Sequence, residues 1–226
     1  MKKLTPLQIA VHLGAWFPLA WLLWDYVNGN LSVNPIQDIT QRTGKYALIL
    51  LLVTLTVTPV NTWLGFRQVV RVRRPLGLYT FFYASLHFLT FIGLDYGFDW
   101  TLLPEAIFEK PFVLVGLAAL TILLALAFTS FKYWQKRLGK NWKRLHRLVY
   151  LAGGLVIVHF AWAKKGNLLG LAGDILQPLL FGLVLVLLLA ARLPVLRRRA
   201  SALRSRLARP RRGPEPASRL DQNIVD

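Results

Sequence analysis

Long runs of apolar residues dominate the pattern of hydrophobic and polar positions along this chain. A helix needs about 20 apolar residues to cross the hydrocarbon layer of a bilayer, which is about 30 Å thick. Six segments meet this requirement and predict an all-α integral membrane protein, a bundle of six spanning helices. The predicted spans are residues 7–27, 45–64, 76–94, 111–131, 145–163 and 171–191.

Composition supports a membrane protein and limits the chemistry of any bound metal. Of the 226 residues, 55% are hydrophobic and 17% are charged, and the mean hydropathy of +0.45 is too apolar for an ordinary soluble domain. Cysteine is absent, which excludes disulfides, thiolate-bound zinc, iron–sulfur clusters and the covalent attachment of c-type haem. A metal in this protein is therefore expected to have histidine or oxygen ligands.

Basic residues gather on one side of the predicted bundle. The formal net charge of +18 is also typical of nucleic-acid-binding proteins, but here lysine and arginine form short clusters between the apolar runs. If both termini are cytoplasmic, 23 of the 28 basic residues lie on the cytoplasmic side and seven of the ten acidic residues lie on the opposite side. This asymmetry predicts that both termini face the cytoplasm, and it argues against nucleic acid as a partner.

The chain is expected to divide into a membrane domain and a tail. Residues 1–195 are predicted to form the six-span transmembrane domain. Residues 196–226 are rich in arginine and poor in apolar residues, which predicts a basic disordered cytoplasmic tail whose arginines contact anionic lipid headgroups. The sequence contains no glycine-rich phosphate-binding motif of the Rossmann or P-loop type.

All four histidines lie within or at the edge of predicted spans, and the loops contain none. Ionisable groups at membrane depth are costly and are functional candidates by default. The four are His12, His87, His146 and His159. For His12, an ordinary hydrogen bond between helices is as good an interpretation as a role at a cofactor.

His87 and His159 are predicted to lie at nearly the same depth. At a rise of 1.5 Å per residue, His87 lies about 16 Å into the third span, and His159 lies about 20 Å beyond His146, which is at the start of the fifth span. Two imidazoles at one level, on helices that run the same way, can bind a planar cofactor between them. Haem b fits best because neutral imidazoles can occupy both axial positions of its iron, whereas zinc and di-iron sites usually recruit thiolates or carboxylates.

His146 is less easily explained. It precedes His159 by thirteen residues, which places the two about 140° apart around an ideal helix. Either the helix is distorted, for which the Gly153-Gly154 pair is the candidate position, or the two imidazoles serve cofactors on different sides. Arg74 precedes His87 by the same thirteen residues and should be level with His146. It is a candidate partner for a haem propionate or a phosphate, although a plain cytoplasmic anchor is an equally good interpretation.

Several segments resemble one family, MsrQ (also called YedZ), the haem-binding membrane subunits of the bacterial protein-methionine-sulfoxide reductase system. The resemblance covers residues 7–195 and includes loop residues such as KRLGKNWKRLH as well as the histidine spacing. More remotely, the chain resembles the ferric reductase and NADPH oxidase membrane domains. The segments that carry the resemblance are VHLGAWFPLAWLLW, LGLYTFFYASLHF, LAFTSFKYWQKRLGKNWKRLHRLVYL and IVHFAWAKK.

The resemblance implies a multi-pass subunit of the bacterial inner membrane with a ferric reductase-like fold. It implies His87, His146 and His159 as ligands of one or two b haems, while Arg74 stands where the oxidases have a fourth histidine. It implies electron transfer from the quinone pool or a cytoplasmic flavin reductase to a periplasmic molybdenum-containing catalytic subunit that repairs methionine sulfoxide. No substrate chemistry is then expected in this chain alone. The family also implies FMN, although the sequence shows no flavin-binding motif.

Two other functions are compatible with histidines inside a membrane domain. A proton-coupled small membrane transporter would use them as a relay, although such relays usually include acidic residues as well. A structural membrane anchor for a soluble enzyme would need none of the four. The haem-binding electron carrier is the function that best accounts for two level histidines.

Overall fold

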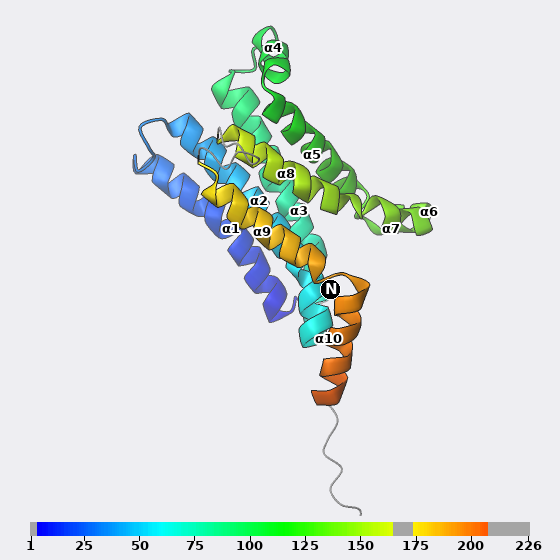
Figure 1. Ribbon diagram of the computed structural model, residues 1–226. Coiled ribbons are helices and arrows are strands. Elements are labelled where there is room, and N and C mark those ends of the chain that lie inside the picture. Colours follow the sequence, from blue (N-terminus) through cyan, green and yellow to red (C-terminus); the bar gives the residue numbers. More distant parts are fainter. Residues whose placement is uncertain (1–3, 165–173, 208–226) are drawn as a thin grey trace, which may run out of the picture.

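The computed structural model describes residues 4–164 and 174–207 as a bundle of helices, with no strand in those residues (Figure 1). The all-α prediction is therefore confirmed. The long helices of the bundle are α1 (Pro6–Val27), α2 (Pro35–Leu64), α3 (Arg73–Leu89), α5 (Pro111–Phe128), α8 (Leu148–Ala163) and α9 (Leu176–Ala190). The shorter helices are η1 (Arg67–Val72), η2 (Thr90–Asp95), α4 (Leu102–Glu109), α6 (Lys132–Leu138), α7 (Lys140–Leu145) and α10 (Pro194–Leu207).

The described helices provide five to six candidate membrane spans. Five stretches are long and apolar enough to cross a bilayer by themselves, and they correspond to the first five predicted spans. α9 and the start of α10 qualify together as one more span, bent by 72° between them. The start of the sixth predicted span, residues 171–173, lies outside the described residues.

α2 begins ten residues before the predicted span, at Pro35. The side chain of Asn34 caps its first turn. Arg42 forms ion pairs with Asp25 at the end of α1 and with Asp38 one turn earlier in α2. Hydropathy detects only the apolar part of a helix, so the polar first turns of α2 are not visible to it.

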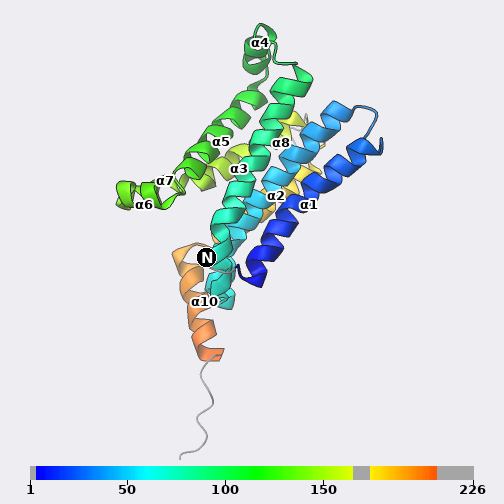
Figure 2. The same ribbon diagram turned by 180° about the vertical axis from the view of Figure 1, so that it is seen from behind.

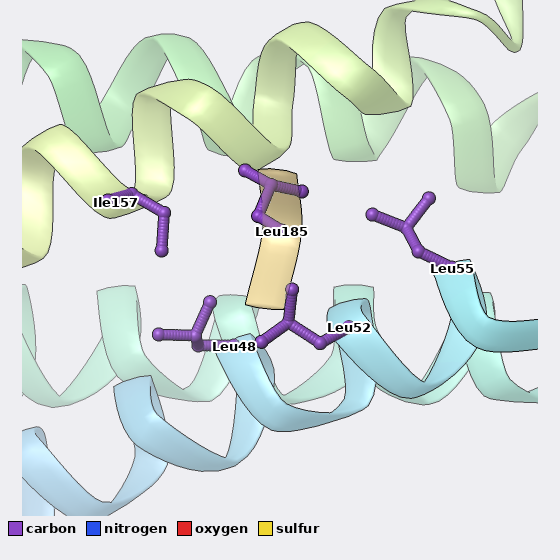
Figure 3. Close-up of a cluster of buried hydrophobic side chains, with 5 residues drawn as sticks. All are labelled: Leu48, Leu52, Leu55, Ile157 and Leu185. Carbon is purple, nitrogen blue, oxygen red and sulfur yellow. The ribbon is translucent and has the colours of Figure 1, made fainter. Parts of the chain in front are cut away.

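α2 lies at the centre of the bundle and contacts α1, α3, α8 and α9. Its residues Leu48, Leu52 and Leu55 are buried against Ile157 of α8 and Leu185 of α9 (Figure 3). The view from behind shows α1, α2 and α3 side by side (Figure 2). Close van der Waals packing must hold these helices together, because lipid tails are as apolar as leucine and burial from lipid contributes little.

Tyr83 of α3 fixes α1 against the bundle. Its side chain is fully buried, and its hydroxyl donates to the Ala15 carbonyl at 2.6 Å and accepts from the Leu19 backbone N–H at 3.1 Å. These two backbone groups are four residues apart and would bond each other in an uninterrupted helix. The tyrosine hydroxyl therefore bridges a backbone pair next to Pro18, which itself has no N–H to donate.

The Gly153-Gly154 pair does not distort its helix, contrary to one of the two explanations offered by the sequence. α8 is continuous through both residues, and the helix is interrupted instead at His146 and Arg147, between α7 and α8. Gly153 has a packing role, because a Cβ atom there would lie 3.1 Å from Leu185 Cδ1 of α9. The absence of a side chain lets α9 approach α8 closely.

The tail predicted to be disordered from residue 196 is helical as far as Leu207. These residues form most of α10, which contacts α2 and extends from one end of the bundle (Figure 1). Arginine, alanine and leucine are strong helix formers. The prediction of disorder rested on low hydrophobicity and did not take this helix propensity into account. Residues 208–226 lie outside the described residues.

Gly153→Leu is expected to destabilise the protein, because the new side chain would force α8 and α9 apart. Overpacking of this kind costs about 1–3 kcal/mol. Gly154→Leu is the matched control, because no atom lies within 4 Å of a Cβ at Gly154. Thermal unfolding of the detergent-solubilised protein should show a lower melting temperature for Gly153→Leu only, and equal losses in both variants would contradict the packing role.

Candidate functional site

A cavity of about 530 Å³ lies between α2, α3, α5 and α8, and His87 and His159 both line it. Their rings meet with centroids 5.9 Å apart and planes at 80° to each other. The sequence placed these two imidazoles at one level, and the structure brings them together. A metal ion with bonds of about 2.0 Å to imidazole nitrogens would fit between two rings at this separation.

Hydrogen bonds to the backbone fix the tautomer of both histidines. His87 Nδ1 lies 2.8 Å from the carbonyl oxygen of Thr40 in α2, and His159 Nδ1 lies 2.6 Å from that of Phe112 in α5. A carbonyl oxygen only accepts, so Nδ1 carries the proton in each ring and Nε2 keeps its lone pair. Within the described part of the chain, neither Nε2 atom has a hydrogen-bond partner. This is the arrangement typical of metal-binding histidines.

Two glycines make room for the imidazoles. A Cβ at Gly44 of α2 would lie 3.0 Å from His87 Nδ1, and a Cβ at Gly116 of α5 would lie 2.7 Å from both Nδ1 and Cε1 of His159. Each histidine thus points across the interface to a neighbouring helix and rests on a glycine there. The hydrogen-bonded carbonyl is found four residues before the glycine in both cases, at Thr40 and Phe112.

The walls of this first cavity suit a large, mainly apolar ligand with polar groups at one edge. Leucine and valine residues such as Leu48, Leu120 and Val156 line one part, whereas lysine, glutamine and asparagine residues line another. A porphyrin has an apolar ring and two carboxylates on one side, so the lining and the donor set both fit haem. In the described residues, no group of three or more His, Cys, Asp or Glu side chains is arranged to hold a bare metal ion.

Lys110 lines the first cavity and is positively charged. It lies just before the start of α5, and its Nζ donates a hydrogen bond of 2.7 Å to the hydroxyl of Tyr96. This hydrogen bond raises the pKa of Lys110 above its ordinary value. The ammonium group is therefore protonated throughout the physiological pH range.

His146 lines a second cavity, of about 200 Å³, together with Arg73 and Arg74. Sequence spacing placed Arg74 and His146 level, and both border this cavity. The His146 ring stacks on Trp142 at a centroid distance of 4.1 Å, and its Nδ1 lies 3.1 Å from the Trp142 carbonyl oxygen. His146 and His159 therefore face different cavities, which agrees with the second explanation that the sequence offered.

The second cavity carries positive charge without acidic partners. No aspartate or glutamate is among the described residues that line it. Ser130, which also lines it, is only 9% exposed, and its hydroxyl oxygen is buried without a hydrogen-bond partner. A buried hydroxyl beside two arginines is suited to a carboxylate or phosphate oxygen.

His12 stands apart from both cavities. Its Nδ1 lies 2.8 Å from the hydroxyl of Tyr79 in α3, and it lines neither cavity. This contact matches the ordinary interhelical hydrogen bond that the sequence left open. Sequence reasoning missed Gly44, Gly116, Arg73 and Ser130, because nothing in a single sequence tells which glycine or hydroxyl will face a histidine on another helix.

Comparison with known proteins gives consistent results. A family model described as "Ferric reductase like transmembrane component" matches residues 43–157. Three similar proteins are each named "Protein-methionine-sulfoxide reductase heme-binding subunit MsrQ". The protein of Bordetella pertussis is 43% identical, over 89% of this chain and 94% of its own. That of Rhodospirillum rubrum is 42% identical over 86% and 91%, and that of Xanthomonas axonopodis pv. citri is 40% identical over 80% and 83%.

Gly116→Ala is expected to weaken haem binding in the first cavity, because its Cβ would overlap the His159 ring and displace it. Disturbing the support of a metal ligand typically lowers affinity about 10- to 100-fold. Gly14→Ala in α1 is the matched control, since its Cβ would meet no atom within 4 Å. Haem titration of the two purified variants tests this, and equal affinities would show that Gly116 does not support the site.

Proposed function

The chain belongs to the MsrQ family of ferric reductase-like membrane proteins, and from this we propose that it binds haem and carries electrons in a protein-methionine-sulfoxide reductase system. The observation that carries the proposal is the pair formed by His87 and His159, with ring centroids 5.9 Å apart and with both Nδ1 protons held by backbone carbonyls. The haem is of the b type, because the chain has no cysteine for covalent attachment.

His87 and His159 would hold the haem through their Nε2 atoms. When bound, the haem iron supplies reversible one-electron chemistry, with a potential set by its ligands and surroundings. The carbonyls of Thr40 and Phe112 hold the ring protons on Nδ1, keep the rings oriented and make Nε2 more basic. Leu48, Leu120 and neighbouring apolar side chains would exclude water from the buried part of the site.

The proposed direction of electron flow follows from the charge pattern of the chain. Both termini are proposed to be cytoplasmic in the bacterial inner membrane, which puts α4 on the periplasmic side (Figure 1). The polar end of the first cavity then faces the periplasm, where a molybdenum-containing catalytic subunit would accept electrons to reduce methionine sulfoxide. The electrons would come from the quinone pool or a cytoplasmic flavin reductase.

The second cavity is proposed to hold a second cofactor nearer the cytoplasmic side. His146 would be its only histidine ligand, and Arg73 and Arg74 would bind its acidic groups. A second haem, with carboxylates, and FMN, with a phosphate, share this chemistry. Either would divide the width of the membrane into two shorter electron transfers.

The alternative function, a proton-coupled transporter, has less support. Each Nδ1 of His87 and His159 is bonded to a carbonyl, so neither ring leads to a further acid or base on that side. Asp25 and Asp38 pair with Arg42, and Asp95, the one acid among the described residues that line the first cavity, acts on the charge of Lys110 there. A relay of the usual kind links the imidazoles to acidic residues in a chain, and no described acid is hydrogen-bonded to either ring.

His87→Ala and His159→Ala are each expected to lower bound haem by at least about tenfold, because each removes an axial ligand inside the first cavity. His12→Ala should leave the haem content unchanged, because His12 lines neither cavity. The measurement is haem per polypeptide, from the reduced-minus-oxidised spectrum of purified protein. A haem-free parent protein that still supports methionine sulfoxide reduction would contradict the proposed function.

His146→Ala is expected to remove the second cofactor while the haem of the first cavity stays bound. The parent should contain two cofactors per chain, either two haems or one haem and one FMN, and the variant should contain one haem. Quantification of haem and flavin in the same samples distinguishes the two identities. A parent with one haem, no flavin and no change in His146→Ala would contradict the second site.

A further inference from the structure

The first cavity is polar at one end only. On α2 the lining residues change from Gln37 and Gln41 near the start of the helix to Leu48 and Leu51 deeper in the bundle. On α5 they change in the same way, from Lys110 just before the helix to leucines further along. The start of α2, the start of α5 and the end of α8 all lie at the end of the bundle that carries α4 (Figure 1).

Three lysines line this polar end, one within α2, one just before α5 and one just after α8. Lys45 follows Gly44, the residue that contacts His87. Lys110 precedes Phe112, whose carbonyl oxygen accepts the hydrogen bond of His159. Lys164 follows the last turn of α8, the helix that carries His159. The three lysines thus line the cavity near the helix ends that lie toward α4, and Lys45 is exposed there.

These lysines are only partly neutralised by the protein. Lys164 forms an ion pair of 3.4 Å with Asp174, and Lys110 is hydrogen-bonded to the neutral hydroxyl of Tyr96. Lys45 has no ion pair within the described residues. Among the residues that line the cavity, Asp95 is the one acid. Among the described lining residues, three lysines thus stand against one aspartate, although Glu109 and Asp174 next to the cavity also oppose their charge.

We propose that Lys45, Lys110 and Lys164 bind the two carboxylates of the haem and thereby fix its rotation about the axial bonds and raise its reduction potential. The inference rests on the proposed function and adds residues that the family resemblance did not supply. An apolar end and a cationic end in one cavity leave a porphyrin with one favourable orientation, with its carboxylates toward α4. Cations near the iron favour its reduced form, which carries one positive charge fewer.

The three lysines are expected to contribute unequally. Asp174 already offsets the charge of Lys164, so the loss of that lysine changes the field at the haem least. Lys45 and Lys110 have no carboxylate within ion-pair distance in the described structure, but Asp95 and Glu109 also act on the charge of Lys110, so the loss of Lys45 is expected to change the field most. This order distinguishes specific binding of carboxylates from a general effect of the net charge of the protein.

The test compares Lys45→Gln, Lys110→Gln and Lys164→Gln in the full-length, haem-loaded protein. Each variant should have a more negative midpoint potential in a spectroelectrochemical titration. Each should also release haem to an acceptor protein about two- to fivefold faster, the range expected for the loss of one exposed ion pair. Lys132→Gln in α6, outside the cavity, is the matched control, and Lys45→Arg, which keeps the charge, should behave like the parent.

A modified haem separates carboxylate binding from indirect effects of the substitutions. Parent and variants are stripped of haem and reconstituted with haem dimethyl ester, in which both carboxylates are blocked. The parent should then release the ester as fast as the lysine variants do, because the lysines can no longer bind the carboxylates. If the variants match the parent with ordinary haem, or if they still release the ester faster than the parent does, the proposal is wrong.

The outcomes also distinguish this inference from the proposed function. A parent protein that binds no haem contradicts both. A parent that binds haem through His87 and His159, together with lysine variants of unchanged potential and release rate, contradicts the lysine proposal alone.

Discussion

The hydrogen bonds from His87 to the Thr40 carbonyl and from His159 to the Phe112 carbonyl are the interactions on which the rest of this structure depends. Each one joins two helices, α3 to α2 and α8 to α5. Each also decides which ring nitrogen keeps a lone pair. The same contacts therefore set the helix packing and the chemistry of the site, so neither can change without the other.

Close helix approach is what makes these hydrogen bonds possible. Gly44 and Gly116 leave room for the imidazoles against the neighbouring backbone, and Gly153 does the same for Leu185 between α8 and α9. In lipid, helices gain little from burying apolar side chains, so small residues at contact points have a large effect on packing. The bundle consequently keeps a wide cavity between four helices while remaining tightly packed elsewhere, as around Leu52.

The sequence predicted much of this arrangement, and its errors have physical causes. Hydropathy and the rise per residue were enough to find the spans and to place His87 level with His159, because both depend on position along single helices. Packing between helices has no signature in one sequence, so Gly44 and Ser130 were not found. The polar start of α2 and the helix of the basic tail were missed because a search for apolar runs ignores helices that are polar.

The central proposal is that His87 and His159 would hold one haem between them with their ring planes at the 80° seen in the structure. Electron paramagnetic resonance of the oxidised protein tests it most directly. Perpendicular imidazole planes leave two iron d orbitals close in energy. The parent is therefore expected to give a strongly anisotropic low-spin ferric signal. In His159→Ala this signal should change to high spin. A high-spin signal in the parent, or a low-spin signal that survives both His87→Ala and His159→Ala, would contradict the account.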